Sequence, residues 1–310
     1  MEDWTGDLEL MHHYTATAHC TFTSSEEVRH ALKHDVIQLG LQYGFLLHQV
    51  LAFSGFHLSY TQPDQRRSYA LRASRHQDRA ITGLRTALAG EVTTKNRHAL
   101  YASSIFLCVC AFATFPSYEA YNKTFNPVDG MVDMLRLMDG ISTIRRGLDL
   151  EILNGPIRGL FLVGQGLPGL ISDRLQQLID RLTSLESQVE SYNFDSDADE
   201  TDIFKHLLRS MVDSILTVHQ NTSSVVSPEL RSIFVWPKLF SGRHLDLIKS
   251  RRPMALVILT YFCVIIHYAT EQCWFVEGWA QAVGYSLEAS LAGTVYEEAI
   301  RWPISIIRQV

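Results

Sequence analysis

The feature that most constrains the fold is an uncharged run near the carboxyl end of the chain. Residues Met254 to Ile266 carry no charge between Pro253 and His267. A membrane-spanning helix needs about 20 apolar residues, and the polar segment that follows, HYATEQCWFVEGW, does not extend the run. The run is also too apolar for a surface helix. We therefore predict no membrane span, but a buried helix that either fills a core or forms the wall of an apolar pocket.

The composition is that of a globular chain long enough to bury a substantial core. The 310 residues are 46% hydrophobic and 19% charged, with a formal net charge of −6. Because basic residues occur only in short runs, we expect no direct nucleic-acid binding. The first residues, MEDWTGDLELMHHYT, lack the pattern of a signal peptide. The five cysteines are widely spaced among apolar neighbours, which favours a cytoplasmic or nuclear location.

Helical periodicity dominates the rest of the chain. Residues 34–60 are apolar nearly all round, which predicts a central helix. A second helix is predicted over residues 63–90, and a third over residues 95–115 with Asn96 as its cap. Residues 171–192 are strongly amphipathic, and we expect them to pack on their own domain instead of forming a coiled coil. The apolar stripe of the second helix consists of Tyr69, Ala73, His76, Ala80, Leu84 and Leu88.

No repeat and no alternating strand pattern is visible in the sequence. We therefore predict an all-α fold, with one large helical domain over residues 1–310. The acidic segment DSDADETD, residues 195–202, is predicted to be a mobile loop inside that domain. It is not a domain boundary in this interpretation, because a helical pattern resumes directly after it.

Motifs for nucleophilic, metal or redox chemistry do not stand out. The chain has neither the G-x-S-x-G elbow of hydrolases nor the H-E-x-x-H motif of zinc enzymes. Cys108 and Cys110 have no second half-site at zinc spacing. No cysteine has an electropositive sequence context, which would favour a reactive thiolate. We therefore predict no metal site and no cofactor.

Aromatic residues gather in the final third of the chain, beside the uncharged run. A filled core explains them, and so does an apolar cavity that contains a few polar groups. For the cavity, Tyr261, His267 and Glu271 are the candidate polar or catalytic groups. The residues that we expect to contact a ligand are His48, Phe53, Tyr261, Phe262, His267, Trp274 and Trp279.

Several segments carry a family resemblance: LELMHHYTATAHCTF, YGFLLHQVLAFSGFHLSY, YALRASRHQDRAITGLRTAL, and RPMALVILTYFCVIIHY with the CWFVEGWAQAV and WPISII that follow it. They resemble the carboxyl-terminal effector domain of fungal zinc-cluster transcription factors, in particular the sterol uptake control proteins. The resemblance is strongest over residues 8–115 and 236–304. It implies an all-helical, often dimeric domain, which in the sterol regulators holds a sterol in a deep apolar pocket and couples its release to nuclear entry and activation. The six-cysteine zinc cluster and basic linker of the family are missing from the sequence, so we expect no DNA-binding module of its own.

Two main functions remain open at this stage. The first is a binding module that takes up a sterol- or terpenoid-like molecule and forms a homodimer or pairs with a full-length relative. The second is a cofactor-independent cyclase or isomerase of fungal secondary metabolism, for example of intramolecular Diels–Alder type, acting on a terpenoid or polyketide in the same pocket. Such a reaction needs a folded substrate and at most a hydrogen-bond donor. A third interpretation is a regulator that acts through protein contacts of residues 171–192.

Overall fold

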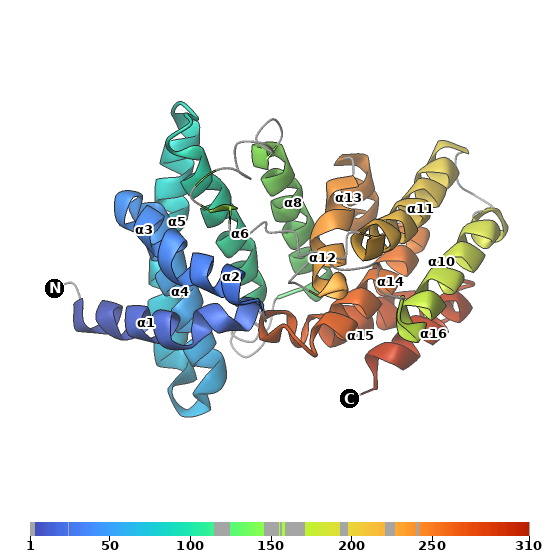
Figure 1. The fold of residues 1–310 in the computed structure, drawn as a ribbon. Helices are drawn as coiled ribbons and strands as arrows, with labels where there is room; N and C mark the ends of the chain where they lie inside the picture. Colours follow the sequence, from blue (N-terminus) through green and yellow to red (C-terminus); the bar gives the residue numbers. More distant parts are fainter. Residues whose placement is uncertain are drawn as a thin grey trace. The chain divides into compact units, whose positions relative to one another are not determined.

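The protein is helical throughout the part of the chain that the structure describes (Figure 1). The structure is a computed structural model, and it describes residues 4–23, 25–114, 125–145, 155, 157–158, 171–192, 198–220, 227–239 and 242–309. Within these ranges there is no β-strand. The predicted all-α fold is confirmed.

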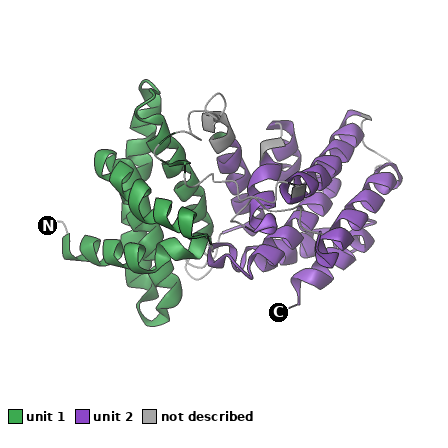
Figure 2. Cartoon of the chain, viewed as in Figure 1, with its two compact units in different colours: residues 1–123, 140–163 green, residues 124–139, 164–310 purple. Residues whose placement is uncertain are grey.

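The chain divides into two compact units, which Figure 2 shows in different colours. The first unit consists of Met1–Lys123 and Gly140–Val163, and the second of Thr124–Asp139 and Gly164–Val310. Each unit has its own central helix. Whether the two units act as the single domain predicted over residues 1–310 stays a prediction.

The first unit is built around α4, Gly44–Thr61, whose residues from Val50 to Ser59 are all buried. A helix that is apolar on all sides is buried fully only when other helices cover every side. Helix α4 contacts α1, α3, α5 and α6. The predicted central helix is thus confirmed. The remaining helices of this unit are α1 (Trp4–Ala16), α2 (Glu26–His30), α3 (Val36–Gln42), α5 (Arg66–Ala89) and α6 (Arg97–Ala113).

The helix predicted over residues 34–60 is interrupted at Tyr43. This residue has an extended backbone, with φ −126° and ψ 90°, so that α3 ends and α4 begins in a new direction. The two helices lie close together on either side of the break. A Cβ atom at Gly40 would lie only 3.4 Å from the backbone of Leu47. The Tyr43 hydroxyl donates to the carbonyl oxygen of Lys95 at 2.9 Å, which ties the break to the start of α6. Hydrophobic periodicity continues across the break and therefore did not reveal it.

The second and third predicted helices correspond to α5 and α6. The predicted stripe of α5 is buried from Tyr69 to Leu84, but Leu88 is 38% exposed because the helix ends one residue later. Asn96 stands at the cap position of α6 as predicted. Its side chain, however, accepts a hydrogen bond from the backbone of Thr93 at 2.8 Å, and so stabilises the preceding turn instead of the helix.

The second unit is built around α14, Pro253–Ala269, which contains the uncharged run. Every residue from Met254 to Ile266 is buried, and Pro253 occupies the first turn, where a missing N–H costs nothing. This confirms the predicted buried helix. Around α14 lie α10 (Asp173–Tyr192), α11 (Ala198–Gln220), α12 (Pro228–Val235), α13 (Gly242–Lys249), α15 (Trp279–Leu291) and α16 (Glu297–Ile307); α8 (Pro127–Arg145) begins in this unit.

The amphipathic helix α10 packs its apolar face within the second unit, mainly on α11. Its predicted apolar residues are all buried, from Leu175 to Val189. Packing on its own domain is therefore confirmed.

The acidic segment 195–202 differs from the prediction. Residues 198–202 are not a loop but the first turn of α11. Acidic side chains are stabilising at this end of a helix, where the backbone dipole is positive. Asp199 forms an ion pair with Arg243, and Glu200 accepts a hydrogen bond from Nε of Arg252 at 3.0 Å. Residues 195–197 lie outside the described part of the chain.

No single helix of the described residues has the length and hydropathy of a membrane span. Helices α13 and α14 together have the required length and hydropathy, but the chain bends by 101° between them.

Candidate functional site

Tyr261 and Phe262 are neighbours on α14 but face different partners. The Tyr261 hydroxyl donates to the carbonyl oxygen of Ala299 on α16 at 3.1 Å, and its burial raises the pKa of Tyr261 to about 12. Phe262 is fully buried against Trp236, with ring centroids 4.7 Å apart. Both side chains thus belong to the packing around α14, and the Tyr261 hydroxyl must leave Ala299 before it can donate to another molecule.

His267 and Glu271 lie at the carboxyl end of α14 and beyond it. Glu271 accepts from Arg174 at 2.6 Å, and the same guanidinium donates to Glu229 at 2.8 Å. The Glu229 side chain is only 6% exposed, so this carboxylate depends on Arg174. Burial lowers the pKa of His267, with Glu271 acting in the opposite direction. Among the described residues, Nδ1 of His267 is buried without a hydrogen-bond partner.

The network of Arg174, Glu229 and Glu271 contains two residues that the sequence did not indicate. Arg174 lies 55 residues from Glu229 and 97 from Glu271 along the chain, and no local pattern signals such a contact. The network joins α10, α12 and the turn after α14. The guanidinium carbon of Arg174 lies 5.0 Å from the centroid of the Tyr268 ring. The network therefore forms a polar edge at the carboxyl end of the otherwise apolar helix α14.

Trp274 and Trp279 flank the turn that follows α14. Trp274 is half-buried and packs edge-on against Phe275, with centroids 5.9 Å apart. Trp279 is 3% exposed and packs edge-on against Phe125 at 6.4 Å. A Cβ atom at Gly130 would lie 2.6 Å from Cζ of Phe125, so a larger residue at this position would require the Phe125 ring to shift.

His48 and Phe53 belong to the first unit, whereas the other predicted ligand contacts belong to the second. Nδ1 of His48 lies 3.0 Å from Nδ1 of His76. Phe53 is fully buried in an aromatic cluster with Tyr14, Phe22 and Phe106. The predicted ligand contacts are thus divided between the cores of two units, and their role in binding stays a prediction.

Gln49 on α4 is a further buried polar residue, and it was not among the predicted site residues. Its side chain is completely buried, and among the described residues neither amide atom has a hydrogen-bond partner. Its backbone oxygen lies 3.9 Å from Sγ of Cys110 on α6, which places it at the contact of these two helices. In the sequence, a glutamine inside an apolar helix is the feature that could have indicated this buried polar position.

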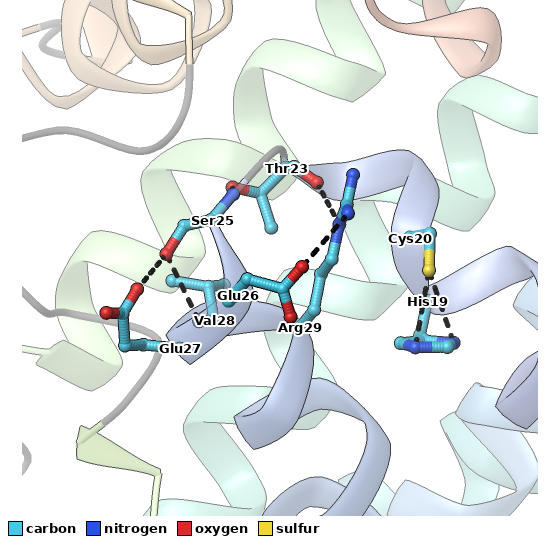
Figure 3. Close-up of polar contacts among 8 residues, drawn as sticks. All are labelled: His19, Cys20, Thr23, Ser25, Glu26, Glu27, Val28 and Arg29. Carbon is cyan, nitrogen blue, oxygen red and sulfur yellow. Dashed lines mark hydrogen bonds and ion pairs between the residues drawn. The ribbon is translucent and has the colours of Figure 1, made fainter.

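Four of the cysteines are buried, and burial raises the pKa of Cys108, Cys110, Cys263 and Cys273. Cys20 is partly exposed. Figure 3 shows its sulfur above the imidazole of His19, at 4.0 and 3.4 Å from the two ring nitrogens. The thiol therefore faces the ring and is not aligned with a nitrogen lone pair, as a general base would require.

The same view shows how α2 begins beside this cysteine (Figure 3). Ser25 caps the helix by accepting from the backbone of Val28 at 3.4 Å, and Arg29 donates to the carbonyl oxygen of Thr23 at 2.9 Å. These contacts are structural. In the part of the chain that is described, no three His, Cys, Asp or Glu side chains gather in a geometry that could hold a metal ion.

Comparison with known proteins bears directly on the predicted resemblance. Residues 9–117, which include α2 to α6 and part of α1, match the profile of the fungal specific transcription factor domain. The predicted family resemblance is confirmed. The chain is also 26% identical over 301 residues to sterol uptake control protein 2 of Candida albicans, a match that covers 93% of this chain and 40% of that protein.

Two further relatives agree with this assignment. The Zn(2)-C6 fungal-type transcription factor afumD of Aspergillus fumigatus is 23% identical over 275 residues, 85% of this chain and 67% of the relative. Sterol uptake control protein 2 of Saccharomyces cerevisiae is 33% identical over 108 residues, 34% of this chain and 11% of the relative. The chain is thus similar to regulatory proteins, and these relatives give no support to the cyclase alternative.

Proposed function

We propose that this chain is a regulatory domain that binds a lipophilic molecule of the sterol or terpenoid class. The observation that carries the proposal is the similarity to sterol uptake control protein 2 of Candida albicans along 93% of the chain. A regulator of this kind works in the cytoplasm and the nucleus. Its partners in the proposal are the lipophilic molecule and either a second copy of this chain or a longer relative.

The chemistry around α14 supports this class of ligand. Burial of apolar surface contributes about 25 cal/mol per Å². The uncharged run of α14, Met254 to Ile266, is buried by its neighbouring helices, so a lipophilic molecule would replace part of this packing. Binding pockets for such molecules combine apolar walls with a few polar groups that fix orientation. Tyr261 and His267 supply such groups on the same helix, and the unpaired Nδ1 of His267 has hydrogen-bonding capacity to spare among the described residues.

A thermal titration of the purified chain tests the proposal. A ligand that binds only the folded state adds about 2.7 kcal/mol of stability at a hundred times its Kd, so the Tm should rise with sterol concentration. The Tyr261→Phe variant should require a ligand concentration higher by about 2- to 10-fold, since one neutral hydrogen bond is worth about 0.5–1.5 kcal/mol.

Tyr285→Phe is the matched control, because Tyr285 is 48% exposed on α15. Its titration should coincide with that of the unchanged chain. A Tm that stays flat across sterols and terpenoids would contradict the proposal. An equal rise with a detergent of similar hydrophobicity would also count against it, since that result indicates unspecific partitioning.

A further inference from the structure

Histidine contacts hold the first helix of the chain in place. Nε2 of His13 on α1 lies 2.8 Å from Nδ1 of His57 on α4, and the two rings stack with centroids 5.0 Å apart. One nitrogen of such a pair must donate and the other must accept. The contact therefore tolerates two neutral rings, but two protonated rings would place two donors and two positive charges against each other.

A second contact involves Asp7, His76 and His48. Nε2 of His76 on α5 lies 3.0 Å from Oδ1 of Asp7 on α1, and Nδ1 of His76 lies 3.0 Å from Nδ1 of His48 on α4. A carboxylate accepts only, so Nε2 of His76 donates to Asp7 and its Nδ1 accepts from His48. A neutral His76 satisfies both contacts, and a singly protonated pair still has one donor and one acceptor between the two rings, so the contact is lost when His48 and His76 are both protonated.

Beneath these contacts α1 covers an apolar surface. Leu10 of α1 packs with Leu51, Leu58 and Tyr69, and Met11 lies at the edge of this cluster. At the far end of α1, Tyr14 is fully buried and donates to the carbonyl oxygen of Leu32 at 3.1 Å. Tyr14 thus anchors the end of the helix, and the preceding residues are held by the histidine contacts and by Glu9 and Leu10.

The other charged groups near His13, His57 and His76 do not cancel the effect of histidine protonation on these contacts. Glu9 is occupied by Arg72 at 2.8 Å and by the Tyr69 hydroxyl at 2.7 Å. His12 lowers and Glu9 raises the pKa of His13, but burial is the largest cause and lowers it. For His76, burial again lowers the pKa, against Asp7 and together with His48 and Arg79. Burial, followed by the charge of His13, lowers the pKa of His57 to about 4.

We propose that residues 4–13 form a latch. The latch is kept closed by the contacts His13–His57 and Asp7–His76–His48, and it opens when these histidines take up protons. Opening pivots at Tyr14 and uncovers the apolar surface of Leu51, Leu58 and Tyr69. The latch makes the exposure of this apolar surface dependent on pH. It rests on contacts inside the first unit and is independent of ligand binding.

The direction of the pH effect follows from proton linkage. His13, His57 and His76 have lowered pKa values in the closed state and regain ordinary values near 6.5 when the latch opens. The open state therefore binds more protons in acid. The closed state is fully favoured above about pH 6.5 and is progressively lost below it, down to the value of about 4 at His57.

Hydrogen exchange of the intact chain tests the latch. Between about pH 7.5 and about pH 5, the protection factors of residues 4–13, corrected for intrinsic rates, should fall by about tenfold or more, because each histidine contributes up to tenfold per pH unit. Protection in α4 and α6 should remain, and an apolar dye should bind as the latch opens. Constant protection of residues 4–13 over this range would overturn the proposal.

Two variants sharpen the test. In the double variant His57→Gln and His76→Gln the drop should become clearly smaller, since glutamine does not titrate and only His13 remains of the three histidines with a lowered pKa. His12→Gln, which changes an exposed histidine of the same helix, should keep the drop. If the double variant does not fold, the imidazole signals of the unchanged chain decide by NMR: His57 should titrate far below 6.5, and an ordinary midpoint with α1 still protected would refute the latch.

Discussion

At the scale of single residues, the buried amide of Gln49 has a direct energetic consequence. A polar group buried without a hydrogen bond costs about 1–3 kcal/mol. Gln49→Met keeps the length of the side chain and removes both unpaired atoms. We therefore expect this variant to raise the free energy of unfolding by about 1–3 kcal/mol, measured by urea denaturation.

The exposed Gln42, at the end of α3, supplies the control. Gln42→Met should change the stability by no more than about 0.5 kcal/mol, as surface substitutions usually do. A loss of stability in Gln49→Met would show that the amide has a partner in the folded protein.

At the scale of the helices, the ion network of Arg174 makes a second prediction. Arg174 is the partner of the buried Glu229 and links α10 to α12. Arg174→Met leaves that carboxylate buried and unpaired, which should cost about 1–3 kcal/mol. The loss is measured by urea denaturation.

Arg209→Met is the matched control for this helix pair. Arg209 is 65% exposed and pairs with Glu186 between α11 and α10. Exposed pairs contribute about 0–1 kcal/mol, so this variant should be nearly neutral. Equal stability losses in the two variants would show that Glu229 does not depend on Arg174.

The helices themselves were largely predictable from the sequence, because their signal is local. The stripe of α10 and the uncharged run of α14 recur at the helical period, and both helices are found close to their predicted bounds. The break at Tyr43 was not predictable, since the apolar pattern of residues 34–60 continues across it. The helical turn at residues 198–202 was missed because an acidic composition is typical both of loops and of helix starts.

At the scale of the whole molecule, the candidate site was less predictable than the fold. Aromatic residues near the uncharged run indicated an apolar environment, but their partners lie far away in the sequence. Tyr261 contacts Ala299, and Trp279 contacts Phe125. The contacts of His13 with His57 of α4 and of Asp7 with His76 of α5 likewise join residues that are 44 and 69 positions apart. Such contacts follow from tertiary packing, which no local period encodes.

The two units give the molecule two separate properties in this account. The second unit supplies the apolar helix α14 and its polar edge, and the first unit supplies the histidine latch. Acid should open the latch without removing a lipophilic molecule that contacts α14 only. Loss of the ligand at the pH at which residues 4–13 lose protection would show that the two properties are coupled.

Extraction of the purified protein is the most direct test of whether the chain binds a sterol- or terpenoid-class molecule. The protein is produced in a fungal host, washed free of loosely bound lipid and extracted with organic solvent, and the extract is quantified by mass spectrometry. We expect an equimolar amount of one such molecule, which Tyr261→Phe reduces and Tyr285→Phe does not. An extract without any stoichiometric lipophile, from a chain that also fails to take up added sterols and terpenoids, would contradict it.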